Sequence, residues 1–469
     1  MSDEPPVADP LATAPRDATL ALSRREAAAS ALTTATSDNF LNAFAVHLNA
    51  SALQLGTLAA IPQLTGATFQ FAALPLDRLT SRRKLVVLGS AIQAAAIASI
   101  ATLALGALPA SMLLLMVFSA TNQAALNLAQ PHWRAWLGRL VPARERGQFF
   151  ASRSRMVMLM SLLVFVLGGA LLSLSARWSM AGVGFALLFA VAALGRVVSA
   201  RSIARMRDPD VGGPVAPQLQ GTLKRVAEAL ADPEFRRYSL FVAGLQGAVA
   251  VTAPFFTAYM LRELQYTYLM FAVNSMTSIA TQFAMMHAWG RIGDRYGNLW
   301  IMRITSSLIT IVPLLWVITP NPLFLLGAQV IAGFAWSGFS LAAGNYLYDI
   351  RPHHTNFAVY AAVQAAFAAV FVCCGALLGG WVAQHVGTFM AHLPSALSSA
   401  PPVFAVFALG ALLRTAVVAG FVPRMTEPLG RPRPQLMQIV FRISQINSIS
   451  GVVLDWLTIA RRGRSDPKK

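Results

Sequence analysis

Runs of about twenty apolar residues recur along the whole chain, and each run is long enough to cross a bilayer as one α-helix. Breaks that contain charged residues, Pro or Gly separate the runs. Only 12% of the residues are charged, whereas soluble domains average ~25%. The pattern predicts an all-α integral membrane protein with twelve transmembrane helices, near residues 29–50, 54–76, 84–106, 110–131, 154–175, 179–199, 239–261, 266–289, 299–319, 322–345, 358–385 and 402–422.

Basic residues are distributed unevenly between the two sides of these predicted helices. If the N-terminus lies in the cytoplasm, all of the 37 Lys and Arg residues except Arg177, Arg262 and Arg414 fall in cytoplasmic segments. This asymmetry follows the positive-inside rule. We therefore expect a multi-pass protein of a bacterial inner membrane with both termini in the cytoplasm. The formal charge of +18 then reports topology and does not indicate nucleic-acid binding.

The longest polar segment between helices divides the chain into two sets of six. Residues 1–28 lack the uninterrupted apolar core of a secretory signal and are expected to form a cytoplasmic tail. The C-terminal tail either lies on the membrane surface as an amphipathic helix or remains disordered. The predicted organisation is tail, six-helix bundle, cytoplasmic loop, six-helix bundle and basic tail, at residues 1–28, 29–199, 200–238, 239–422 and 423–469.

Four short sequence matches relate the two halves at a nearly constant separation. The matching pairs are Asp77-Arg78 with Asp294-Arg295, Gly168-Gly169 with Gly379-Gly380, 139–142 with 349–352, and 205–209 with 424–428. Matches in this order predict two pseudo-symmetric bundles related by an axis along the membrane normal. Repeats of this kind place a substrate site between the halves near the membrane midplane.

The sequence Gly290-x-x-x-Asp294-Arg295-x-Gly297-Asn298 resembles the cytoplasmic motif of the major facilitator superfamily of transporters. Its counterpart within 73–84 departs from that motif, because Ala73, Thr80 and Ser81 replace two glycines and an arginine. The resemblance covers residues ~30–425 and implies the fold of that superfamily, with two bundles of six helices.

The resemblance also implies a gating role for the cytoplasmic motif. Its charged pairs would bridge the halves only when the cytoplasmic side is closed, and so bias the protein between two states. The alternative is that these residues only cap helices and mark topology. The motif residues are Asp77, Arg78, Gly290, Asp294, Arg295 and Gly297.

Polar side chains recur at helical spacing on the predicted helices 1, 4, 7 and 10. Such stripes are costly against lipid, so we expect them to line a cavity. Proteins similar to this one surround their central cavity with these four helices. The candidate solute and proton pathway residues are Asp38, Asn42, Gln123, Asn127, Gln130, Gln246, Trp336 and Ser340.

Asp38 is the one acidic residue deep within a predicted helix. Its position corresponds to a depth of about 14 Å in a hydrocarbon core of ~30 Å. Asp38 is therefore a proton-coupling site, a counter-charge for a cationic substrate, or a structural carboxylate bonded to Asn39 or Asn42. Arg414 is also intramembrane; it either extends toward the cytoplasmic face or contacts substrate.

These features predict a secondary active transporter that moves a small organic solute by alternating access, with proton coupling if Asp38 titrates. The alternative is a membrane sensor or assembly partner that retains the fold without transporting. An enzyme is not expected, because the sparse acids and scattered histidines form no catalytic constellation and no nucleotide-binding loop occurs. We expect a monomer in the lipid bilayer with no cofactor, metal or nucleic acid, and structural roles for Cys373 and Cys374.

Overall fold

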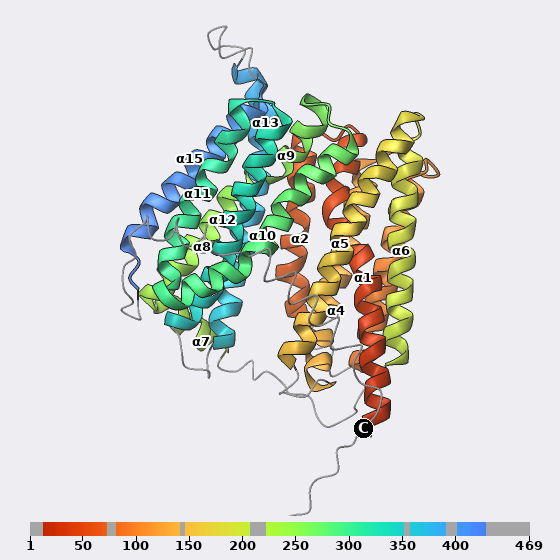
Figure 1. The fold of residues 1–469 in the computed structure, drawn as a ribbon, viewed down its shortest axis with the longest axis horizontal. Coiled ribbons are helices and arrows are strands. Elements are labelled where there is room, and N and C mark those ends of the chain that lie inside the picture. Colours follow the sequence, from red (N-terminus) through yellow and green to blue (C-terminus); the bar gives the residue numbers. More distant parts are fainter. Residues whose placement is uncertain are drawn as a thin grey trace, which may run out of the picture. The chain divides into compact units, whose positions relative to one another are not determined.

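The fold was obtained as a computed structural model, which describes residues 13–72, 81–140, 146–206, 222–350, 357–390 and 401–427 (Figure 1). All regular elements in these ranges are helices, as the sequence predicts. Membrane-spanning segments must satisfy their backbone hydrogen bonds internally, and helices do so.

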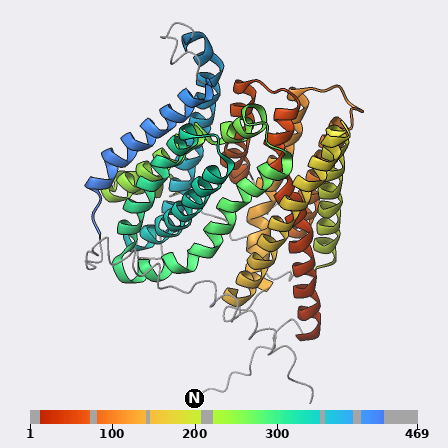
Figure 2. The same cartoon turned by 45° about the horizontal axis from the view of Figure 1, so that its top comes forward.

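The first half of the chain forms six long helices. They lie side by side in both views, coloured from red to yellow-green (Figures 1 and 2). Their bounds are α1 Thr13–His47, α2 Ala52–Ala72, α3 Arg82–Ala104, α4 Met112–Leu140, α5 Arg146–Arg177 and α6 Ala181–Arg205.

The second half contains six further long helices and several short ones. Their bounds are α7 Thr222–Ala231, α8 Pro233–Ala250, α9 Ala253–Ala258, the π-helical turn η2 Tyr259–Glu263, α10 Tyr268–Tyr296, α11 Asn298–Ile318, α12 Pro322–Ile350, α13 Phe357–Met390, α15 Val403–Phe421 and the 3₁₀ turn η3 Val422–Arg424.

The predicted helix at 239–261 is built from three consecutive pieces, α8, α9 and η2. The interruption falls between Ala250 and Ala253, just before Pro254. Proline has no N–H to donate, so the hydrogen-bond ladder of α8 cannot continue unchanged through this position. The hydroxyl of Thr252, which is buried, donates to the carbonyl of Val249 at 3.1 Å and satisfies one backbone acceptor at the break.

Nine helical segments among the described residues are long and apolar enough to cross a membrane. The helices α1, α2 and α10 are long but fall outside this group, because polar side chains lower their hydropathy. With these three, the described helices account for the twelve predicted membrane helices. Helix α1 thus forms as predicted, although its hydropathy alone would not identify it as a membrane helix.

Helix α1 begins at Thr13, well before the predicted start at residue 29. Its early turns are not a solvated tail, since Ser23, Glu26 and Ala27 are buried. The predicted loop at residues 200–238 also contains helix, because α6 continues to Arg205 and α7 covers Thr222–Ala231. The segment from 428 to 469, where the second tail is predicted, lies outside the described residues.

The chain divides into two compact units that do not follow the two halves of the sequence. The first unit comprises Met1–Leu223, Gln246–Met276 and Ala365–Gly410, and the second comprises Lys224–Leu245, Thr277–Gln364 and Ala411–Lys469. The helices α8, α10, α13 and α15 each contribute residues to both units.

An aromatic cluster forms the core of the first unit. Phe40 packs edge-to-face on Phe165 with ring centroids 5.0 Å apart, and Phe44 lies 5.1 Å from Phe185. These rings come from α1, α5 and α6, which pack against one another. Gly168 admits the ring of Phe40, because a Cβ there would lie 2.9 Å from two of its carbons. The cluster therefore fixes α1 between α5 and α6.

In the second unit, α12 packs against α11 and α10. The backbone of Gly338 on α12 approaches the rings of Trp289 so closely that a Cβ would lie 2.7 Å from Trp289 Cε2. The indole N–H of Trp289 donates to the carbonyl of Phe334 at 3.0 Å. The hydroxyl of Tyr238, on α8, donates to the carbonyl of Ala343 at 2.7 Å. The buried polar groups of Trp289 and Tyr238 are thus paired with helix backbone.

Candidate functional site

Four of the predicted pathway residues lie half-buried on α1 and α4 in the first unit. They are Asn42, Gln123, Asn127 and Gln130. The amide of Asn127 donates to the carbonyl of Gln123 at 2.9 Å and to the Thr65 hydroxyl of α2 at 3.4 Å. Asn127 therefore faces α2, and part of its polarity serves the packing of α4 on α2.

The other predicted pathway residues are divided between the units. Gln246 is half-buried in the first unit, whereas Trp336 and Ser340 belong to α12 in the second. Trp336 packs edge-to-face on Phe339 with centroids 5.8 Å apart, and Ser340 is exposed. Asp38 is a residue of α1, and its side chain lies outside the described part of the chain.

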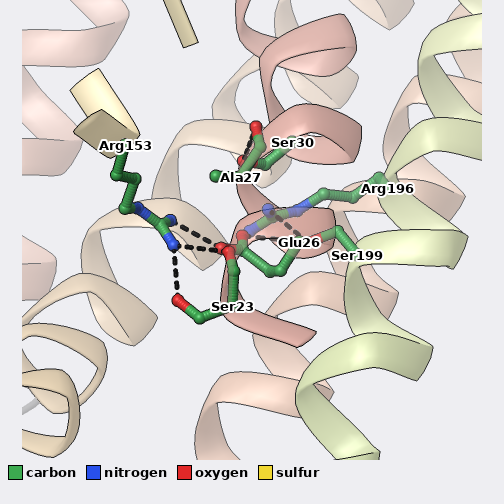
Figure 3. Close-up of polar contacts among 7 residues, drawn as sticks. All are labelled: Ser23, Glu26, Ala27, Ser30, Arg153, Arg196 and Ser199. Carbon is green, nitrogen blue, oxygen red and sulfur yellow. Dashed lines mark hydrogen bonds and ion pairs between the residues drawn. The ribbon is translucent and has the colours of Figure 1, made fainter. Parts of the chain in front are cut away.

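A charged network that the sequence analysis missed joins α1, α5 and α6 (Figure 3). The carboxylate of Glu26 accepts from Arg153 Nη2 at 2.5 Å, and the same guanidinium donates to the carbonyl and hydroxyl of Ser23 at 2.9 Å. On the other side, the Ser199 hydroxyl donates to Glu26 Oε1 at 3.2 Å and accepts from Arg196 at 3.2 Å. Arg153 thus contacts the buried carboxylate directly, and Arg196 is linked to it through Ser199.

Burial makes this network energetically demanding. Glu26 is 3% exposed and Arg196 is 8% exposed. A charge removed from water needs both an ionic partner and hydrogen bonds, and losing one partner leaves the other strongly destabilising. Arg153 is further stabilised by the face of Trp133, whose centroid lies 5.3 Å from its guanidinium carbon. The network therefore holds three helices in one arrangement.

Two signals in the sequence pointed to this network. The helical segment preceding residue 29 runs through SRREAAASAL without Gly or Pro, so the first helix had no reason to stop there. Arg196 also stands within an apolar run, where a cation requires a counter-charge. Glu26 supplies that charge from a residue that the sequence analysis assigned to a tail.

The motif from Gly290 to Asn298 joins α10 to α11. Gly297 has φ of +96°, a conformation that residues other than glycine rarely adopt, and it precedes the first residue of α11. The Glu427 carboxylate packs against it, since a Cβ on Gly297 would lie 2.6 Å from Glu427 Oε2. Only a glycine fits both the backbone angle and this contact.

The motif pattern predicts that Asp294 caps the start of α11. In the structure Glu427 caps it instead. The N–H of Leu299 donates to Glu427 Oε2 at 3.2 Å, where a carboxylate is favoured by the helix dipole. Asp294 belongs to the last turns of α10 and is exposed. The amide of Asn298 donates instead to Asp349 at 2.6 Å. Two acids from distant segments thus hold the motif.

The charged residues of the motif are available at the surface of their unit. Arg295 is exposed and lies over the ring of Tyr296, 5.4 Å from its centroid. Within the described ranges no ion pair joins Asp294 to Arg295. Gly290 is half-buried and makes only ordinary contacts. Asp77 and Arg78 lie outside the described residues.

Arg414 is buried and does not extend to the surface of its unit. Arg414 is 2% exposed, and its guanidinium donates to the carbonyl of Ile309 on α11 at 3.0 Å. Arg414 therefore links α15 to α11. Cys373 is buried and Cys374 exposed, both with free thiols, and the described residues contain no cluster of His, Cys, Asp and Glu that could hold a metal.

A sequence profile described as Major Facilitator Superfamily matches residues 27–286 and 238–460. The chain belongs to this superfamily. Membership makes the protein a multi-pass membrane transporter, not an enzyme, and it accounts for the paired six-helix bundles. The two overlapping matches also agree with the internal repeat.

Solved structures of superfamily transporters share the fold at low sequence identity. A mutant form of the nucleoside transporter NupG has a TM-score of 0.62 and 15% identity, covering 87% of this chain and 100% of that chain. A D-xylose-proton symporter has a TM-score of 0.60 and 13% identity over 89% and 98%. A bacterial homolog of the human lysosomal transporter Spinster, inward-facing and unoccupied, has a TM-score of 0.58 and 16% identity over 90% and 100%. A search of curated proteins finds no match.

Replacing Glu26 should destabilise this transporter far more than replacing an exposed acid. We expect Glu26→Ala to lower the free energy of unfolding by about 3–5 kcal/mol, because Arg153 and Arg196 lose their shared counter-charge. Glu26→Gln should cost less, since an amide still accepts hydrogen bonds. Denaturant unfolding in detergent measures the difference, with Glu228→Ala on the exposed side of α7 as the control. Equal stability of the Glu26→Ala and Glu228→Ala variants would contradict the role assigned to the network.

The two motif glycines should respond differently to alanine. Gly297→Ala should lower stability by about 1–3 kcal/mol, because alanine is strained at positive φ and its Cβ collides with Glu427. Gly290→Ala should be nearly neutral, since its Cβ would lie 3.9 Å from the nearest atom, on Leu341. Melting temperatures of the purified variants test this prediction. Similar losses at both positions would show that the Gly297 conformation is not the reason for its glycine.

Proposed function

We propose that this protein is a secondary active transporter that carries a small organic solute across a bacterial inner membrane by alternating access, with both termini in the cytoplasm. Proton coupling through Asp38 is part of the proposal. The protein functions as a monomer, with the solute, protons and surrounding lipid as its partners. The proposal rests on superfamily membership and on the polar side chains that α1 and α4 carry inside an otherwise apolar unit.

The half-buried amides of α4 are the observation that supports a solute path most directly. Gln123 and Gln130 lie on a membrane helix, where an amide facing lipid is costly. Both side chains are partly accessible and neither is enclosed by packing. Asn42 is similarly half-buried on α1, which contacts α4. Uncharged amides both donate and accept hydrogen bonds, so they suit a neutral polar or zwitterionic solute.

Close backbone contacts join the two sequence halves within the first unit, on the side predicted to face outward. A Cβ on Gly56 of α2 would lie 2.9 Å from Gly380 Cα of α13. A Cβ on Gly169 of α5 would lie 2.9 Å from the carbonyl oxygen of Tyr268 on α10. Small residues let helices meet without interlocked side chains, so the surfaces can separate with little repacking. Alternating access requires contacts of this kind.

Arg262 provides a polar contact on the same side. Its guanidinium donates to the carbonyl of Ala50 at 2.8 Å, just after the end of α1. This links η2 of the second sequence half to the first helix. A single charge-assisted hydrogen bond contributes a few kcal/mol at most, which is the scale on which two access states are balanced.

Asp38 is the proposed proton carrier because Glu26, the acid of α1 whose side chain the structure describes, is already paired. Glu26 is held by Arg153 and Ser199, which makes it a structural carboxylate. Asp38 lies about 18 Å further along α1 at ~1.5 Å per residue. A carboxyl at this position can couple proton uptake to solute binding.

Solute binding should depend on Gln123 and not on its neighbour Thr121. A bound solute raises the melting temperature of a transporter. Nucleosides and D-xylose, which are named for two of the transporters of similar fold, are the first probes to screen. For any solute that stabilises the protein, Gln123→Ala should weaken binding about tenfold through the loss of a hydrogen bond. Thr121→Ala is the control, because Thr121 is exposed and bonded to its own helix. Equal binding by both variants would remove α4 from the solute path.

Proton coupling predicts that flux of that solute requires both a gradient and the Asp38 carboxyl. In energised vesicles, Asp38→Asn and a proton uncoupler should each abolish accumulation, while Asp38→Glu retains part of it. Protein levels and melting temperatures of the variants control for insertion and folding. Accumulation that survives both treatments would exclude Asp38 from coupling. Binding without flux under any gradient would favour a sensor.

A further inference from the structure

An apolar groove of about 880 Å³ runs between α3 and α6 in the first unit. It extends from Val87 to Leu105 on α3 and from Val183 to Arg201 on α6. At ~1.5 Å per residue the α3 side is about 27 Å long, close to the ~30 Å thickness of the hydrocarbon core. The groove therefore follows both leaflets of the bilayer.

Alanines on both helices create this groove. Ala91, Ala95 and Ala98 line the α3 side and are exposed, and Ala190 lies opposite on α6. The exposed side chain of Leu187 stands along the α6 side. Only Thr102 and Arg201 among the lining residues are polar, so the groove suits a hydrocarbon chain.

One end of the groove is strongly basic. Arg201 lines the groove itself, and Lys84 and Arg205 are exposed at the adjoining ends of α3 and α6. The guanidinium of Arg83 donates to the carbonyl of Ala204, so the start of α3 and the end of α6 are in contact there. Neither α3 nor α6 contains an Asp or Glu residue. This cationic end lies on the side that the charge distribution assigns to the cytoplasm.

We propose that this groove is a binding site for an anionic phospholipid of the inner leaflet. An acyl chain lies in the alanine-lined part, and the phosphate headgroup contacts Arg201 and Lys84. The arrangement joins an apolar channel of acyl-chain length to cations at headgroup depth, which is the chemistry that recognises anionic lipids. The proposal is independent of the identity of the transported solute.

Charge argues against a second copy of this chain as the occupant. Two copies in one membrane that pack through this groove are related by an axis along the membrane normal. Their basic ends would then lie at the same depth and repel each other, because like charges across an interface disfavour association. A lipid phosphate neutralises the same cations.

The test is native mass spectrometry of the purified full-length protein titrated with phosphatidylglycerol or phosphatidylcholine. Phosphatidylglycerol should bind more tightly by about fivefold for each cation that contacts its headgroup. Arg201→Gln and Lys84→Gln should each reduce this preference about fivefold, and the double variant should abolish it. Arg291→Gln, at an exposed cation of α10, is the control and should leave the preference unchanged.

Filling the groove provides a second, charge-independent test. Ala98→Phe should reduce retention of both lipids, whereas Ala365→Phe, which adds the same bulk at an exposed position of α13 away from the groove, should not. If Ala98→Phe lowers the melting temperature, the smaller substitution Ala95→Leu replaces it in this test and should have the same effect on lipid retention. Equal affinity for the two lipids, a preference that survives the double variant, or a dimer that Ala98→Phe disrupts would each overturn the proposal.

Discussion

The bilayer's lack of hydrogen-bonding partners is the constraint on which the rest of this structure depends. Because each backbone N–H and C=O must be satisfied within its own segment, the chain is committed to helices before any tertiary contact forms. Burial of apolar surface then contributes little to helix association, since lipid is as apolar as the helix faces. The arrangement of the helices is therefore determined by two kinds of contact: close packing at small residues and a few buried polar contacts.

Both devices are visible where α1 meets its neighbours. Gly195 on α6 lets α1 approach so closely that a Cβ would lie 2.8 Å from the carbonyl of Ala29. The Thr33 hydroxyl donates to the carbonyl of Ala192 at 2.8 Å in the same region. One turn or two earlier, Glu26 adds the ionic contact with α5 and α6. Close packing, a neutral hydrogen bond and an ion pair thus act along the same stretch of α1. Together they fix both where α1 lies and how far it is shifted along its axis relative to α6.

The sequence predicts the helices well and their contacts poorly, for a physical reason. Helix formation is a local property of apolar runs, so the number and approximate places of the helices could be inferred, including a first helix of low hydropathy. The burial of the early turns of α1 could not, because nothing local distinguishes an exposed tail helix from one buried against α5. Glu26 and Glu427 illustrate the same limit, since each acts on residues far away in sequence and lies outside the motifs that suggested a site.

The predicted pathway residues show where pattern reasoning stops. A polar stripe on α4 identifies residues that avoid lipid, but it does not separate those that serve a solute from those that serve packing. Asn127 bonds to α2 through Thr65, whereas Gln123 and Gln130 remain half-buried. The geometry thus ranks residues that the sequence treats alike. Trp336 and Ser340 belong to the other unit, and all of these residues stay predictions as parts of a solute path.

The two intramembrane arginines show how the repeat has diverged. Arg196 on α6 and Arg414 on α15 occupy similar places in the two halves, yet their partners differ. Arg196 reaches an acidic network through Ser199, whereas Arg414 donates to a backbone carbonyl of α11. A carbonyl cannot change its charge, but a carboxylate can. On α1, Glu26 is a fixed anchor and Asp38 is the proposed proton carrier, whereas the contact of Arg414 with Ile309 joins α15 to α11 through an uncharged carbonyl. The proposal therefore assigns the response to a proton gradient to Asp38, in the first half of the sequence.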